Sequence, residues 1–208
     1  MPISVRKSDL TLLRLGLLKV CDYEAIDRLL AGIASHVAGE HAALAETAKA
    51  IQSQPADAEF DREFEEMMLG DERVFLGELQ ELSAELAIVA LYKKIEISTK
   101  QAVVLALPNI APDKLFQIKE LKKALKAEGI NISSLPNFRA MDELRCINNS
   151  VKHSGVVSSE LSAYPGWKMG QRLSNLESAY RRLAPLATSY VSELVGALMK
   201  CHRLSAGR

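Results

Sequence analysis

The feature that most constrains the fold is a helical repeat of apolar residues early in the chain. After Asp22 the apolar side chains return every three or four positions, at Ile26, Leu29, Leu30, Ile33, Val37, Leu44, Ala48 and Ile51. This spacing places them on one face of an α-helix, and Asp22 is a suitable N-terminal cap. Gln54 and Pro55 predict its end, because proline cannot continue a helix interior.

The same period continues through the rest of the chain, which is rich in Leu, Ala, Glu and Lys and only 5% aromatic. Such a composition favours helices over sheets. We therefore expect an all-α fold, an antiparallel helical bundle in one domain of residues 1–208. Within it we expect N-terminal helices in 1–54, an acidic and partly helical linker or flanking segment in 55–70, and a core in 71–208. The core helices are predicted at about 71–97, 98–107, 112–129, 136–155 and 169–202, the last kinked or restarted at Pro185.

The long helix predicted after Asp71 has an expected packed side and an expected end. Its apolar residues Phe75, Leu79, Leu82, Leu86 and Val89 share one side, which is expected to be packed. Ser98 and Gln101 form a capping-box pattern, which predicts that a new helix begins there.

Charge and cysteine content exclude several classes of protein. The net charge is +0, so no overall basic field indicates nucleic acid, although residues 57–81 are acidic and basic residues dominate after Lys93. The three cysteines are widely spaced and lack a C-x-x-C pair, which indicates a reduced, cytoplasmic protein. The apolar stretches are too short for a transmembrane helix. His36, Glu40 and His41 are expected on a solvated helix face, so neither a metal nor a cofactor is expected.

The most unusual stretch is Asp142 to Gly155, DELRCINNSVKHSG. On a helix, Met141, Leu144, Ile147 and Val151 share the packed side, while Arg145, Asn149 and His153 follow one another at intervals of four along a flank. Asparagine and histidine are only middling helix formers, so propensity does not explain them. A guanidinium and an imidazole on one flank suit RNA cleavage, in which the 2′-hydroxyl is the nucleophile and no metal is required.

The string ELRCINNSVKHSG, late in an all-α chain, resembles the signature helix of HEPN (higher eukaryotes and prokaryotes nucleotide-binding) domains, over about residues 75–202. The resemblance implies a metal-independent endoribonuclease, of the kind found in toxins and phage defence, that assembles its site across a homodimer from an R-polar-x3-H motif. With the histidine at His153, the polar position falls on Asn149 and the arginine position on Asn148. The nearest arginine is Arg145, one turn upstream.

The catalytic candidates are accordingly Arg145, Asn148, Asn149 and His153. Further RNA contacts are expected from Lys152, Arg139 and Trp167. In this interpretation His153 transfers a proton, Arg145 stabilises the phosphorane charge, and the two asparagines position the phosphate or the 2′-hydroxyl.

The sequence leaves structural explanations open for the same residues. Asn148 can bond a neighbouring helix, Arg145 can form an ion pair with Asp142, and His153 can interact with the helix dipole. Trp167 can be a packing anchor, and the lysine-rich face around residues 119–126 can serve solubility rather than follow phosphates. Two other functions therefore stand beside the ribonuclease. One is an inactive HEPN-like module that binds RNA or a protein such as a nucleotidyltransferase antitoxin, and the other is a plain helical adaptor.

Overall fold

The structure is a computed structural model that describes residues 7–53, 59–111, 115 and 117–206. The predicted all-α class is confirmed, since no β-strand occurs in these residues and only one isolated bridge, Val156 to Arg172, is formed. The helices are α1 (Lys7–Leu18), α2 (Glu24–Gln52), α3 (Glu59–Ala106), α4 (Ile118–Ala127), α5 (Phe138–His153) and α6 (Leu176–Ala206). None of the helices described is long and apolar enough to cross a membrane.

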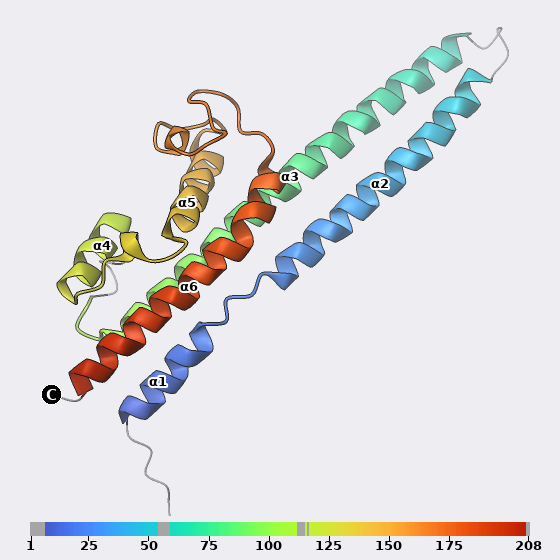
Figure 1. Ribbon diagram of the computed structural model, residues 1–208. Coiled ribbons are helices and arrows are strands. Elements are labelled where there is room, and N and C mark those ends of the chain that lie inside the picture. Colours follow the sequence, from blue (N-terminus) through green and yellow to red (C-terminus); the bar gives the residue numbers. More distant parts are fainter. Residues whose placement is uncertain (1–6, 54–58, 112–114, 116, 207–208) are drawn as a thin grey trace, which may run out of the picture. The chain divides into compact units, whose positions relative to one another are not determined.

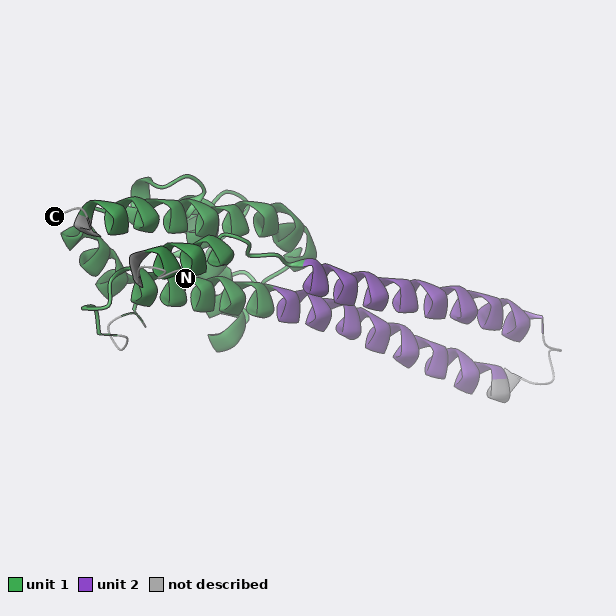
Figure 2. Cartoon of the chain, turned by 90° about the horizontal axis from the view of Figure 1, so that it is seen from below, with its two compact units in different colours: residues 1–23, 88–208 green, residues 24–87 purple. Residues whose placement is uncertain are grey.

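The chain divides into two compact units (Figure 2). Residues 24–87 form what we call the helical hairpin, made of α2 and the first part of α3. Residues 1–23 and 88–208 form what we call the bundle unit, with the rest of α3 and helices α1, α4, α5 and α6. The boundary between the units falls inside α3, so a single helix contributes to both.

The two arms of the helical hairpin run side by side in opposite directions (Figure 1). Leu30, Val37 and Ile51 are buried on α2, and Leu69 and Leu76 are buried on α3. These positions are seven residues apart or a multiple of seven, the repeat that keeps one seam of a helix facing its neighbour. The hairpin is therefore held by a coiled-coil-like seam.

Two boundary expectations for α3 differ from the structure. Residues 59–70, expected as a partly helical linker or flanking segment, belong to α3, and the break predicted at Ser98 is wrong because α3 continues to Ala106. No proline or glycine precedes Ser98 in this region, and Lys100 forms an ion pair of 2.8 Å with Glu96 one turn back. Thr99 is buried against the bundle, so this stretch packs as helix interior rather than as a cap.

The prediction of which side of α3 is packed is also wrong within the hairpin. Phe75, Leu82 and Leu86 are 55%, 52% and 52% exposed, while Leu76 and Ala84, from the neighbouring arc, are almost fully buried. Apolar residues occupy two arcs of this helix, and periodicity alone does not determine which of two arcs a partner covers. One apolar arc of α3 therefore remains on the surface.

The core of the bundle unit is built around α6, against which α1 and α5 both pack. Leu183, Tyr190 and Leu194 of α6 are fully buried, as are Leu144 and Ile147 on the predicted packed side of α5. The last helix begins at Leu176 rather than near residue 169, and it continues through Pro185 without restarting. The lysine-rich helix begins at Ile118 rather than at residue 112, and residues 112–114 lie outside the description.

The segment between α5 and α6, residues 154–175, is tied back onto the end of α5 and is called the α5–α6 loop below. Val157 N–H donates to the carbonyl of Gln171 at 2.8 Å, and Leu173 N–H donates to the carbonyl of Gly155 at 2.9 Å. These bonds flank the bridge between Val156 and Arg172. The loop therefore places Arg172 next to the backbone that leaves α5.

Candidate functional site

Arg145 lies inside a network of acidic side chains rather than pointing into solvent. Its Nε donates to Asp142 Oδ1 at 2.8 Å and its Nη2 donates to Glu160 Oε2 at 3.1 Å. Asp142 also accepts from the Tyr164 hydroxyl at 2.8 Å. Burial lowers the pKa of Arg145, but the hydrogen bonds and charges of Asp142 and Glu160 outweigh it and raise the pKa above the usual range.

The ion pair between Arg145 and Asp142, one of the structural explanations left open by the sequence, is confirmed. The Arg145 side chain is only 15% exposed. A phosphate at this guanidinium would compete with Glu160, which is the more exposed of its two carboxylate partners.

Cys146, next to Arg145, is buried and unsuited to act as a nucleophile. Burial raises the pKa of its thiol to about 11, and the positive charge of Arg145 offsets only part of that effect. The thiolate is the reactive form of cysteine, so a raised pKa makes this thiol inert at neutral pH.

We expect stability to fall at alkaline pH, partly because of Cys146. The pKa of the thiol in the folded state lies above its unfolded value of about 8.5, so between these values the native state keeps a proton that the unfolded state has lost. The contribution of Cys146 to the free energy of unfolding is therefore fully present below about pH 8.5 and is lost as the pH rises towards 11. Tyr92, whose pKa burial raises to about 12, acts in the same direction. Urea unfolding at pH 8 and at a pH near 10.5 measures the loss.

The control for this effect is Cys146→Ala, which we expect to lose less stability between the two pH values than the native chain. Comparing the two losses, rather than the midpoints, removes the constant cost of deleting a buried thiol. Equal losses in the two proteins would show that Cys146 does not contribute.

Asn148 is 1% exposed and faces the core. Its Nδ2 donates to Asn149 Oδ1 at 3.4 Å, and its own Oδ1 has no hydrogen-bond partner among the described residues. In this conformation solvent does not reach the amide, which is where a phosphate would have to approach. The burial of Asn148 therefore favours a structural role over the predicted role in positioning RNA.

Asn148→Leu is expected to raise the free energy of unfolding by about 1 kcal/mol, because it removes an unsatisfied buried acceptor and keeps a similar volume. Thermal or urea unfolding measures this change. Asn149→Leu, on the exposed neighbouring residue, is the matched control and is expected to change stability by less than about 0.5 kcal/mol. A destabilised Asn148→Leu variant would show that the amide has a partner in solution.

The outer end of α5 carries the predicted site residues that solvent does reach. Asn149, Lys152 and His153 are all exposed, in contrast to Arg145 and Asn148. The three residues predicted to follow one another along one flank of α5 are thus separated. Arg145 lies inside the acidic network, whereas Asn149 and His153 are exposed to solvent.

Arg172 is a site residue that sequence reasoning missed. Its backbone pairs with that of Val156, which follows His153 by three residues in the chain. It also lines a polar surface pocket of about 250 Å³ together with Lys168 and Arg182. No local pattern in the sequence indicates this, because the pairing joins two parts of a loop sixteen residues apart.

Trp167 forms another wall of this pocket, which we call the basic pocket. Its indole Nε1 donates to Glu143 Oε1 at 2.9 Å, and Arg182 Nη2 donates to the same oxygen at 2.6 Å. Arg182 Nη1 completes a two-pronged contact with Oε2 at 3.1 Å. Trp167 is therefore an anchored side chain, as the packing explanation expected, yet it still lines an open pocket.

Arg139 lies at the other end of α5 from His153. It is exposed, and its guanidinium carbon lies 5.8 Å from the centroid of the Tyr164 ring, within the range of a cation–π contact. The predicted RNA contacts are thus distributed along α5 and the α5–α6 loop rather than gathered at one point.

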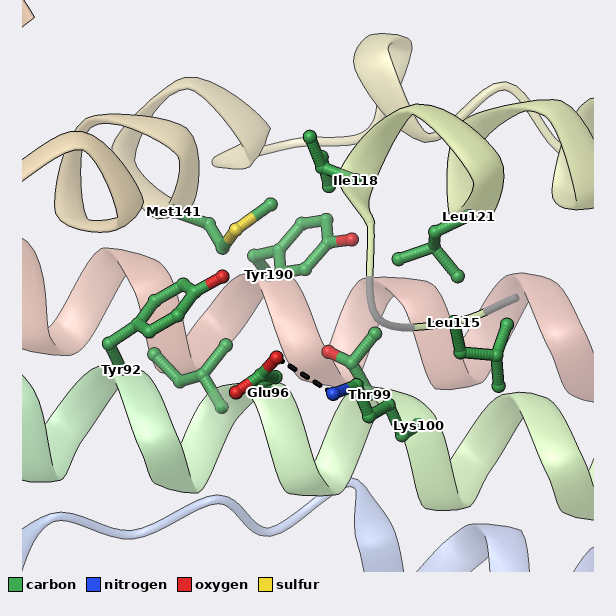
Figure 3. Close-up of a pocket in the computed structure, with 10 residues that line it drawn as sticks. Tyr92, Glu96, Thr99, Lys100, Leu115, Ile118, Leu121, Met141 and Tyr190 are labelled. Carbon is green, nitrogen blue, oxygen red and sulfur yellow. Dashed lines mark hydrogen bonds and ion pairs between the residues drawn. The ribbon is translucent and has the colours of Figure 1, made fainter. Parts of the chain in front are cut away.

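A second cavity lies inside the bundle unit but is too small for a ligand. Its volume is about 30 Å³, and Tyr92, Glu96 and Tyr190 are among its lining residues (Figure 3). The Tyr190 hydroxyl is buried without a partner in the described part of the chain. A volume of this size accommodates one water molecule, so the cavity is a hydration site at most.

Among the described residues no group of three or more His, Cys, Asp or Glu side chains is placed to hold a metal ion. His36 Nδ1 lies 3.7 Å from Glu40 Oε1 on the exposed face of α2. No protein-family model matches the chain, and comparisons with curated proteins and with solved structures find no match either.

Proposed function

We propose that this chain is a HEPN-like module that binds the phosphate backbone of RNA without cleaving it. One observation carries the proposal: the α5–α6 loop connects the exposed end of α5 to the basic pocket. Lys152 and His153 lie at the end of α5, and Lys168 lines the basic pocket. Arg172 joins the two, because it pairs with Val156 just after α5 and also lines the pocket. Lysine and arginine side chains contact phosphates without reading bases, and an aromatic wall such as Trp167 offers a surface for a base to stack on.

The state of Arg145 is the reason to favour binding over cleavage. A cleavage site must stabilise charge that develops on the phosphate, and a preorganised cation supplies that stabilisation. Here the guanidinium is already neutralised by Asp142 and Glu160. Among the site residues His153 is the one histidine, so each chain offers one imidazole for proton transfer there, whereas attack by the 2′-hydroxyl benefits from both an acid and a base.

The endoribonuclease remains the second candidate, and the exposure of His153 favours it. In that case a homodimer supplies the second histidine, and Arg145 or Arg172 supplies the cation. The two functions differ in whether RNA ends with a 2′,3′-cyclic phosphate appear in the absence of metal.

The test is to incubate the purified chain with labelled structured and single-stranded RNA in EDTA, and to measure binding by fluorescence anisotropy and cleavage by end-group analysis. We expect binding that weakens with added salt, and intact RNA. Cyclic-phosphate ends that disappear with His153→Ala would establish the ribonuclease instead. Absence of binding at low salt would overturn both functions.

A further inference from the structure

The uncovered arc of α3 in the helical hairpin forms a continuous apolar stripe. Its members, each between 51% and 56% exposed, are Phe64, Met68, Phe75, Leu82 and Leu86, which we call the α3 stripe. At 100° per residue they fall within an arc of about 40°, so they line up along the helix. The stripe lies to one side of the buried seam that contains Leu69 and Leu76.

An acidic border runs along one edge of the α3 stripe. Asp71, Glu78 and Glu85 are seven residues apart, so they follow one another on the same side of the helix, next to the apolar residues. Asp71 and Glu78 are exposed and Glu85 is half-buried. Residues 62–86 contain eight acidic residues and two arginines, a net charge of −6. An exposed apolar surface rimmed by one sign of charge is typical of a docking site.

A second copy of the chain is the first occupant to consider, since the spacing of the α3 stripe is symmetric about Phe75. An antiparallel copy would match Phe64 with Leu86 and Met68 with Leu82, as a twofold interface requires. The same register brings Asp71 of each copy close to Glu78 of the other, one residue from direct opposition. The register that pairs the apolar residues of two copies therefore also places their carboxylates against each other. Repulsion between these like charges disfavours self-pairing at neutral pH.

We propose that the α3 stripe docks a basic amphipathic helix of another protein. Such a helix would lay apolar residues spaced by three and four along the stripe and a row of lysine or arginine residues along the acidic border. Phe64 and Phe75 supply rigid apolar contacts, and Met68 supplies an adaptable one. All residues of this surface belong to the helical hairpin, so the proposal is independent of RNA binding by the bundle unit.

The experiment uses the full chain and a fluorescein-labelled peptide of leucine and lysine, about 18 residues and five helical turns long, patterned to form an amphipathic helix. A peptide of the same composition, with the leucines and lysines shuffled to remove the helical period, is the control. We expect the patterned peptide to bind at least about tenfold more tightly than the shuffled one. We also expect binding to weaken as salt rises.

Variants then locate the binding surface. Phe75→Ser with Leu82→Ser, and separately Glu78→Lys with Glu85→Lys, are each expected to weaken binding of the patterned peptide at least about tenfold. Leu17→Ser and Glu193→Lys change exposed residues of the same kinds in the bundle unit and are expected to leave binding unchanged. Circular dichroism checks that each variant is folded.

Several results would overturn the proposal. One is equal binding of the two peptides, and another is full binding of the patterned peptide by the folded stripe variants. A third is a dimer in analytical ultracentrifugation at neutral pH that Phe75→Ser dissociates, since a second copy would then occupy the stripe.

Discussion

Replacing Glu143 by alanine is expected to lower the free energy of unfolding by about 3 kcal/mol and to shift the fluorescence of Trp167 towards that of a solvated indole. Glu143 is only 4% exposed, and its two oxygens accept three hydrogen bonds from Trp167 and Arg182. The carboxylate thus connects α5 to both the α5–α6 loop and α6. Its loss leaves the indole N–H unpaired and removes one of the loop's anchors on α5, while Tyr164 and Glu160 of the loop stay bound to Asp142 and Arg145.

The expected cost lies near the lower end for breaking a buried ion pair, because Arg182 is 51% exposed and water can solvate its charge afterwards. Trp167 is the single tryptophan of the chain, so its emission reports this site alone. Urea unfolding, followed by fluorescence and by circular dichroism, gives both the global stability and the local change.

Two control variants separate the causes. Glu143→Gln keeps an acceptor for the indole but loses the charge that pairs with Arg182, so we expect an intermediate loss of stability. Glu177→Ala removes a half-buried glutamate that pairs with the exposed Arg181 at 2.7 Å, and we expect it to cost less than about 1 kcal/mol. An equal cost for Glu143→Ala and Glu177→Ala would show that Glu143 does not anchor the loop.

Local periodicity was sufficient to predict the all-α class and the packed side of α5, but not the bounds of α3. Leu144 and Ile147 are fully buried as the 3.6-residue period requires, because the rest of α5 is too polar to offer a second apolar face. In α3 the same reasoning failed. Phe75 and Leu76 are adjacent in sequence and both strongly apolar, and only the position of α2 determines that Leu76 is covered.

The candidate site shows the same limit at longer range. The pairing of Arg145 with Asp142 lies within one helical turn, so the sequence alone indicates it as one alternative. Its second partner, Glu160, lies fifteen residues away across the α5–α6 loop, and Arg172 reaches the end of α5 through the same loop. Irregular loops have no period, so the contacts that neutralise one arginine and position another depend on tertiary folding.

Reversing the charges of Lys152 and Lys168 together is expected to weaken RNA binding at least about 30-fold at roughly 100 mM salt, and to reduce the dependence of affinity on salt by about one counterion for each lost phosphate contact. Both lysines are exposed, one at the end of α5 and one at the basic pocket. Folding should therefore be unaffected. Fluorescence anisotropy over a series of salt concentrations measures affinity and slope together.

Lys119→Glu with Lys123→Glu is the matched control, since it makes the same change of charge on the exposed face of α4. If the lysines of α4 serve solubility, this variant keeps most of its affinity, because charges beyond a Debye length of about 10 Å from the bound phosphates are largely screened. If both pairs weaken binding equally, RNA senses only the overall charge of the chain and the site proposed at α5 is wrong. A loss confined to Lys152 and Lys168 would place the RNA along the path from His153 to Trp167, which is the geometry that the bridge between Val156 and Arg172 creates.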